Sequence, residues 1–221
     1  MGAAAADLAK AQAPLAAAFA KKTSVAIRWI TGSSGVLAQQ AEHGAPYDVF
    51  AAADTEHIDE LARKGFTIAG TRAIYARGRL VLWVPNPRVP VERIEDLLHH
   101  DVTHIAIANP RLAPYGRAAE ESLRGAHLWE TVQPRIVFAE NVSMATQYAA
   151  SGNADVAFTA LALVYDRPGR KIEIPESLHA PIDQAIAVIR GTSKVDLARK
   201  FVDFVTGAAA KQVLQRYGYS N

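Results

Sequence analysis

The sequence predicts an α/β protein of two lobes, each a mixed, mostly parallel sheet flanked by helices. Short apolar runs alternate with helical patterns from residue 3 to residue 64, which is typical of parallel strands joined by helices. The same alternation returns between residues 94 and 160, after a long extended stretch that Pro85 terminates. We therefore expect two sheets, with the chain crossing from one lobe to the other and back.

Composition narrows the class of protein. The chain has 221 residues, of which 50% are hydrophobic, enough for a real core. Its formal net charge is +2 without a dense basic run, so we expect no nucleic-acid partner. It has no cysteine, which excludes disulfides, thiolate metal sites and a cysteine nucleophile. No apolar stretch reaches the roughly 18 residues that a membrane-spanning helix needs.

The first lobe opens with a strand, a helix and a second strand. Residues 3–22 read as the end of an apolar strand followed by an amphipathic helix. Asp7 stands directly before the helical run, where a carboxylate favours the N-cap position. A second strand is predicted at Val25–Ile30.

That second strand leads into a glycine-serine loop at the start of a helix. Ser33 and Ser34 lie between Gly32 and Gly35, and glycine lets a backbone approach a ligand closely. At a helix start the N–H groups, the helix dipole and serine hydroxyls together suit a small anion. An ordinary serine N-cap fits this stretch equally well.

A third strand is predicted to end at Asp54. Ligands of open α/β sheets gather at the carboxyl ends of strands, which makes Asp54 a candidate site residue. The alternative is a structural role as the N-cap of the helix Glu56–Lys64.

The crossings divide the chain into lobes that are not continuous in sequence. The extended stretch 70–84 enters the second lobe, and the apolar, β-rich stretch 182–190 returns from it. A helical tail, broken at Gly207, then packs back on the first lobe. The predicted bounds are residues 1–77 with 187–221 for lobe I, residues 78–186 for lobe II, and crossings near 75–80 and 183–188, with a ligand cleft between the lobes.

The second lobe repeats the pattern of a strand followed by a loop and a helix. A strand at 104–108 precedes a loop in which Tyr115 is well placed to offer a backbone N–H at the start of a helix over 117–123. A strand at 135–138 runs into Asn141 and Val142, where another helix begins. The other elements expected here are a helix at 94–99, a turn and buried strand at 152–160 and a surface loop at 166–170.

The sequence lacks the patterns of the common enzymes. The run Gly32-Ser33-Ser34-Gly35 is one residue too short for a nucleophile elbow, and no phosphate-binding or dinucleotide-binding glycine motif follows a strand. An enzyme using Asp7 or Asp54 as a base would lack a nucleophile and a cofactor, so we expect no enzyme and no cofactor.

Histidines are the remaining candidates for a metal site. His99, His100 and His104 are close in sequence, but the strand that begins at His104 breaks their helical spacing. We expect them to be surface residues, and no metal cation to be bound.

Several stretches, taken in order, resemble one family. They are AAADL, GSSGVLAQQAEHGAPYDVFAAAD, YARGRLVLWVPNP, IAIANPRLAPYGRAAEESL, ENVS, SGNADVAFTAL and RYGY, which together span almost the whole chain. In order and spacing they resemble the periplasmic molybdate-binding proteins of ABC importers, which have the type II periplasmic binding protein fold.

The resemblance implies an oxyanion, molybdate or tungstate, held without cationic side chains in a closing cleft. Its donors would be Ser34, the backbone of Tyr115 and the backbone of Val142. Ser33 and Asp7 would be further ligand-binding positions. The residues expected to line the cleft are Asp54, Asn141 and Phe158.

Two residues depart from the pattern of the family. Many members have serine or asparagine at the position of Asp7, and tyrosine at that of Phe158. A carboxylate facing a dianion is repelled, so either Asp7 turns away as an N-cap or the ligand brings a proton. A receptor of the same fold for phosphate, sulfate or an organic acid is therefore the alternative function.

The resemblance also implies a setting for the protein. We expect a monomer in the periplasm, its signal peptide removed, that delivers its ligand to the membrane permease of an ABC importer. The sequence does not rank molybdate against tungstate, because the two ions are nearly equal in size and charge.

Overall fold

The computed structural model describes residues 1–220, which fall into two compact units. Unit 1 is Met1–Gly78 together with the chain from Asp183 onward, and unit 2 is Arg79–Ile182. The chain therefore changes unit after residue 78 and again after residue 182, whereas the sequence suggested changes after 77 and after 186. The later change lies earlier than predicted because the return strand, from Asp183 on, pairs inside unit 1.

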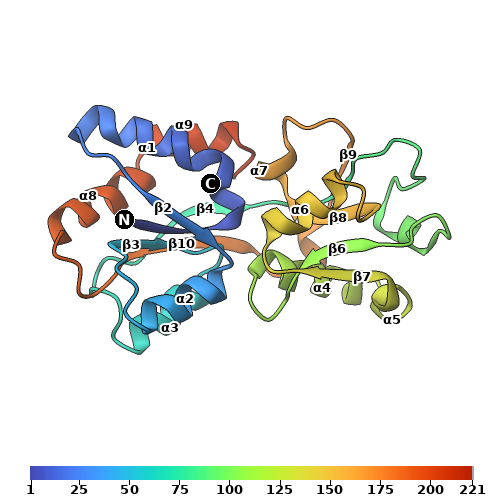
Figure 1. Ribbon diagram of the computed structural model, residues 1–221, viewed down its shortest axis with the longest axis horizontal. Helices are drawn as coiled ribbons and strands as arrows, with labels where there is room; N and C mark the ends of the chain where they lie inside the picture. The colour runs from blue at the N-terminus through green and yellow to red at the C-terminus, as the bar shows by residue number, and fades with distance from the viewer. Residues whose placement is uncertain (221) are drawn as a thin grey trace. The chain divides into compact units, whose positions relative to one another are not determined.

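Unit 1 is built on a five-stranded mixed sheet with the order β2-β1-β3-β10-β4 (Figure 1). Strand β1 is parallel to β2 and to β3, and β10 is antiparallel to β3. Its strands are β1 (Gly2–Ala5), β2 (Trp29–Gly32), β3 (Val49–Ala51), β4 (Ala73–Gly78) and β10 (Ile182–Val188).

Helices cover both faces of this sheet. Figure 1 shows α2 and α3 on one side of it and α1, α8 and α9 on the other. The helical elements are η1 (Ala6–Leu8), α1 (Ala9–Thr23), α2 (Ser34–Glu42), α3 (Glu56–Arg63), α8 (Val195–Thr206) and α9 (Ala208–Arg216). The tail breaks at Gly207 as predicted.

Two strands of unit 1 differ from their predicted bounds. Strand β2 begins at Trp29 rather than at Val25, because its hydrogen bonds come from β1 and that register opens with Gly2 opposite Trp29. Strand β3 ends at Ala51 rather than at Asp54. The N–H of Ala52 still donates to the carbonyl of Ala185 in β10, and the chain leaves the sheet after it because the N–H of Ala53 donates to a side chain of α2.

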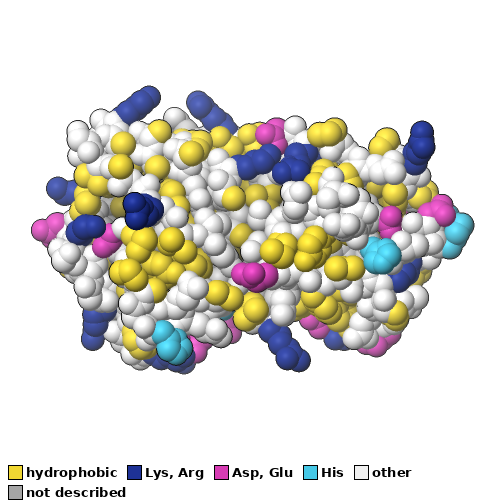
Figure 2. Space-filling view, in the orientation of Figure 1, with side chains coloured by type: hydrophobic (Ala, Val, Ile, Leu, Met, Phe, Trp, Pro, Cys, Tyr) yellow, Lys and Arg dark blue, Asp and Glu magenta, His cyan; other side chains and the backbone are white. Residues whose placement is uncertain are grey.

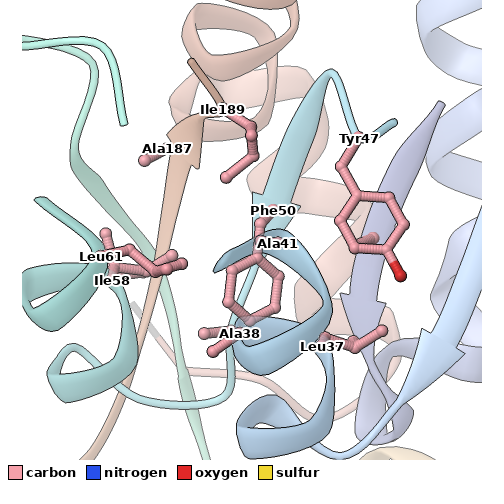
Figure 3. Packing of buried hydrophobic residues seen from close by; sticks show 12 residues of the cluster. Leu37, Ala38, Ala41, Tyr47, Phe50, Ile58, Leu61, Ala187 and Ile189 are labelled. Atoms are coloured by element: carbon pink, nitrogen blue, oxygen red, sulfur yellow. The ribbon is translucent and has the colours of Figure 1, made fainter. Parts of the chain in front are cut away.

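The core of unit 1 lies between the sheet and the helices α2 and α3. Figure 3 shows Leu37 and Ala41 of α2 beside Phe50 of β3, with Ile58 and Leu61 of α3 on the other side of that ring. All five side chains are 3% exposed or less. Burying each leucine, isoleucine or phenylalanine side chain stabilises the fold by about 1.5–3 kcal/mol, so this packing fixes α2 against the sheet.

Unit 2 has a second five-stranded mixed sheet, with the order β7-β6-β8-β5-β9. Strand β6 is parallel to β7 and β8, while β5 is antiparallel to β8 and β9. The strands are β5 (Leu80–Val84), β6 (Ile105–Ala108), β7 (Ile136–Ala139), β8 (Val156–Ala160) and β9 (Arg170–Glu173).

The helices of unit 2 include the two that begin at the predicted binding loops. They are η2 (Ile94–Leu98), α4 (Pro114–Gly125), α5 (Trp129–Val132), η3 (Gln133–Arg135), α6 (Val142–Ala150), α7 (Leu161–Val164) and η4 (Glu176–Leu178). Helix α4 begins before the predicted Arg117 because Pro114 occupies its first turn, where a missing N–H costs nothing. Strand β9 and the short helices α5 and α7 were not predicted.

The surface agrees with the weak net charge. Lys and Arg side chains are scattered over the face shown in Figure 2 rather than gathered in one band. Among the described residues, no helix is both long and apolar enough to cross a membrane.

Candidate functional site

The start of α2 lies at the carboxyl-end edge of the unit 1 sheet. Ser33 is the N-cap residue of α2, yet its side chain makes no capping hydrogen bond. Its Oγ is buried and has no hydrogen-bond partner. Leaving a buried hydroxyl without a hydrogen bond costs free energy, so Ser33 Oγ is a candidate to bind a ligand group.

Ser34 is completely buried beside it and does have a partner. Its Oγ accepts a hydrogen bond of 3.0 Å from the N–H of Ala53, in the segment after β3. A hydroxyl that accepts in this way keeps its own hydrogen for donation. The first hydrogen bond inside α2 runs from the N–H of Leu37 to the carbonyl of Ser33, so the N–H groups before Leu37 point out of the helix end.

Asp7 does not cap a helix, and that prediction is wrong. It lies inside the short helix η1, and neither η1 nor α1 has a side-chain cap. Its carboxyl group is fully buried instead, where Oδ2 accepts from Gln184 Nε2 of β10 and, at 2.9 Å, from the hydroxyl of Tyr219. The capping preference is local, whereas the two groups that donate to Oδ2 come from positions remote in sequence.

The other oxygen of Asp7 is left over. Oδ1 is buried and makes no hydrogen bond of normal geometry, although the N–H groups of Asp7 and Leu8 lie close enough to favour the charged form. Burial raises the pKa of Asp7 from 3.8 to about 6, against the opposing effect of the hydrogen bonds from Gln184 and Tyr219.

Asp54 supports the start of α3, in agreement with the structural role that the sequence analysis gave as the alternative to ligand binding. Its Oδ1 accepts from the N–H of His57 at 3.2 Å, and the His57 ring lies 2.8 Å from Oδ2. The formal N-cap of α3 is Thr55, which has no side-chain cap, so Asp54 takes over that task from one residue earlier. Asp54 follows β3 at the same edge as the α2 start.

In unit 2, the start of α4 is pressed against the end of β6. Tyr115 is 2% exposed and lies in the first turn of α4, whose N–H groups point out of the helix end. At Gly116 a Cβ atom would lie 2.1 Å from the carbonyl oxygen of Ala108. Only glycine allows this approach, and the approach fixes where the N–H of Tyr115 points.

The start of α6 is built in a similar way. Asn141 is the N-cap, and its side chain accepts from the N–H of Met144 at 3.0 Å. The first bond inside α6 runs from the N–H of Ala145 to the carbonyl of Asn141. This leaves the N–H groups of Val142 and Ser143 ahead of the helix ladder. Phe158 is 1% exposed in β8, opposite Leu82 of β5.

The predicted surface histidines remain apart from these loops. The side chains of His99, His100 and Asp101 offer ligand atoms within 4.8 Å of one another, but all three residues are exposed. His104 is exposed too, and its N–H donates to Asp155.

Three residues of the buried cluster around Asp7 were missed at the level of sequence. They are Gln184, Tyr219 and Tyr75, whose hydroxyl donates to Gln184 Oε1 at 2.7 Å. One signal in the sequence could have indicated this cluster, because Gln184 is a polar residue inside a mostly apolar strand.

The predicted site residues fall into two sets. In unit 1 the structure brings four of them to one edge of the sheet: Asp7, Ser33, Ser34 and Asp54. In unit 2 three of them lie at helix starts: Tyr115, Asn141 and Val142.

The chemistry of both sets is that of anion capture. The groups in question are N–H groups at the starts of helices of at least nine residues, and short hydroxyls. A comparison with known families agrees: the model of the family described as "Bacterial extracellular solute-binding protein" matches residues 2–220. The chain belongs to this family of extracellular solute-binding proteins.

Individual solute-binding proteins are similar over most of their length. The molybdate-binding protein ModA of Rhodobacter capsulatus is 33% identical over 209 residues, covering 93% of this chain and 81% of that protein. ModA of Azotobacter vinelandii is 34% identical over 209 residues, covering 93% and 83%. The solved structure of the periplasmic molybdate-binding protein of Azotobacter vinelandii matches with a TM-score of 0.96 and covers 100% of this chain and 99% of that one.

A more distant structure shows the fold alone. The sulfate-binding protein SubI of Mycobacterium tuberculosis matches with a TM-score of 0.84 at 15% identity. Together these matches confirm the predicted two-lobed α/β fold of the type II periplasmic binding proteins and the resemblance stated for the sequence.

Proposed function

We propose that this chain is a receptor that captures molybdate or tungstate for an ABC importer. The observation that carries the proposal is the start of α2, where Ser33 Oγ is buried without a partner and Ser34 Oγ keeps its hydrogen for donation. Two relatives named for molybdate binding, at 33% and 34% identity, and a solved structure with that name support the choice of ligand.

The donors proposed for the oxyanion are short hydroxyls and backbone N–H groups. They are the hydroxyls of Ser33 and Ser34 and the N–H groups of Tyr115 and Val142. Asp54, Asn141 and Phe158 would line the site. None of these seven residues is a cation, so selectivity would come from the number and direction of donors rather than from net charge.

The function is binding and delivery rather than catalysis. The partner is the membrane permease of the importer, and the place of action is the periplasm, as the name of the matching Azotobacter vinelandii structure states for that protein. We expect the receptor to act as a monomer, which light scattering at micromolar concentration measures.

A thermal-shift panel tests the ligand. Molybdate, tungstate, sulfate, phosphate and chromate are each added to the purified protein, and a ligand at about 100 times its dissociation constant adds about 2.7 kcal/mol of stability. We expect stabilisation by molybdate and tungstate at micromolar concentrations. Stabilisation by phosphate or sulfate alone would replace the proposed ligand with the alternative one.

A pair of substitutions tests whether the α6 start binds the ligand. Val142→Pro removes the N–H at the first helical position, where proline is tolerated and where the preceding Asn141 is already extended, at φ −147° and ψ 171°. Val142→Ala keeps the N–H and removes at least as much of the side-chain packing as proline does. We expect Val142→Pro to weaken molybdate binding by about 1.5–3 kcal/mol more than Val142→Ala does. Equal effects in calorimetry would remove Val142 from the site.

A further inference from the structure

Among the described residues, four buried side-chain polar atoms lack a hydrogen-bond partner. Two of these four lie just after two strands that pair with each other. They are Asp7 Oδ1, just after β1, and Ser33 Oγ, just after β2. The strands are parallel, and their last residues, Ala5 and Gly32, are opposite each other in the register. Both atoms therefore belong to the same edge of the sheet, the edge at which the oxyanion is proposed to bind.

We propose that Asp7 makes this receptor take up its oxyanion together with one proton, which is held between Asp7 Oδ1 and an oxygen of the ligand. This inference rests on the proposed function, because it concerns the same site. It adds a proton-linked step that an uncharged donor at this position would not have.

The hydrogen bonds of the other carboxyl oxygen decide where the proton sits. Oδ2 accepts from Gln184 and from Tyr219, and an oxygen that already accepts from two donors has no room for a proton of its own. Gln184 cannot turn its amide around without loss, because its Oε1 accepts from Tyr75. The proton is therefore directed to Oδ1, the oxygen without a partner.

The surroundings make Asp7 the group that titrates. The carboxyl faces Gln184 from β10, Tyr219 from the end of the chain and the N–H groups of Asp7 and Leu8. Of these only Tyr219 is ionisable, and phenols ionise near pH 10 in water. At the same edge Asp54 is hydrogen-bonded to His57, so the test must separate the effect of Asp7 from that of this pair.

A bound dianion strengthens the preference of Asp7 for its neutral form. Burial already raises its pKa to about 6, and a negative ligand raises the pKa further. At pH 7.5 the unliganded carboxyl is therefore mostly ionised, while in the complex one proton is shared with the ligand. Binding must take up about one proton, and the dissociation constant should rise about tenfold for each pH unit above 6.

Calorimetry of the wild-type protein measures this directly. Molybdate is titrated at pH 7.5 in buffers of different ionisation enthalpy, and the dissociation constant is then followed from pH 5.5 to 8.5. We expect uptake of about one proton at pH 7.5 and a dissociation constant that is flat below pH 6 and rises above it. Sulfate, which carries no proton over this range, serves as a second probe if it binds.

Asp7→Asn is the decisive variant. Its side-chain oxygen can accept from Gln184 and Tyr219, and its NH₂ group then stands where Oδ1 was and donates permanently. We expect a dissociation constant that does not change with pH and no proton uptake. The matched control is Asp59→Asn, which neutralises an exposed carboxylate of the same unit that is paired with Arg72, and which should keep the slope of the wild type.

The outcomes separate this inference from the proposed function. If the wild type binds molybdate without proton uptake and with a flat pH profile, the role of Asp7 is refuted while the receptor function stands. If Asp7→Asn keeps the full pH dependence, a group other than Asp7 is responsible for it, and the inference fails. If the folded wild type binds none of the oxyanions at any pH, the proposed function itself fails.

Discussion

The buried carboxyl of Asp7 should make the unliganded protein less stable at neutral pH than it would otherwise be. The pKa of Asp7 is about 6 in the folded protein and 3.8 in an unfolded chain. Between these values the folded state binds more protons than the unfolded state, so the free energy of unfolding falls as pH rises from 3.8 to about 6 and stays level above it. At about 1.4 kcal/mol for each pH unit, ionised Asp7 costs about 3 kcal/mol.

Asp7→Asn removes this dependence, which makes the cost measurable. We expect the difference in free energy of unfolding between Asp7→Asn and the wild type to shift in favour of the variant by about 3 kcal/mol between pH 3.8 and pH 7. Urea denaturation without any oxyanion, repeated across this range, gives the difference at each pH. Effects of asparagine that do not involve ionisation are the same at every pH and cancel. A difference that stays constant would show that Asp7 is not perturbed, and the argument from burial would be refuted.

Three further substitutions test the loops. Ser34→Ala should weaken molybdate binding by about 1–3 kcal/mol, because a buried donor to a charged ligand is lost. Tyr115→Phe should change the binding little, because only the backbone of Tyr115 is proposed to bind. The reverse order of effects in calorimetry would contradict these roles. Gly116→Ala should destabilise the protein by more than about 2 kcal/mol, because its Cβ would lie 2.1 Å from the carbonyl oxygen of Ala108. Gly125→Ala is its control in the same helix, where the nearest neighbour would be a leucine side chain at 3.3 Å, and a similar loss of melting temperature in both variants would refute the packing argument.

Much of the fold could be predicted because its signals are local. The helix after Ser33, the helix after Asn141 and the break at Gly207 follow from residues next to them in the chain. The predicted strand ends were less accurate, because the end of a strand depends on its partner strand. Strand β2 begins where β1 offers hydrogen bonds, at Trp29, and nothing in the stretch from Val25 onward contains that information.

The candidate site was predictable to the same extent. Ser34, Tyr115 and Val142 lie at helix starts that local patterns mark. Asp7 was misjudged because capping preference is a local rule, whereas its two donors are 177 and 212 residues away in sequence. The hydrogen-bond partners of a buried carboxyl depend on tertiary contacts, so only the structure reveals the cluster around Asp7.

The position of the return strand has a consequence for the order of folding. Strand β10 lies between β3 and β4 in the sheet of unit 1, and Tyr219 and Ser220 then attach to Asp7 and Arg77. Until residues 183–188 have been synthesised, β4 has no neighbour to join it to β1, β2 and β3. Unit 2 needs only the continuous stretch 79–182, so it can be complete while unit 1 is still open. Strands β1, β2 and β3 therefore reach their final contacts only after β10 has joined the sheet, and the edge that is proposed to hold the anion is complete only when Tyr219 has bonded to Asp7.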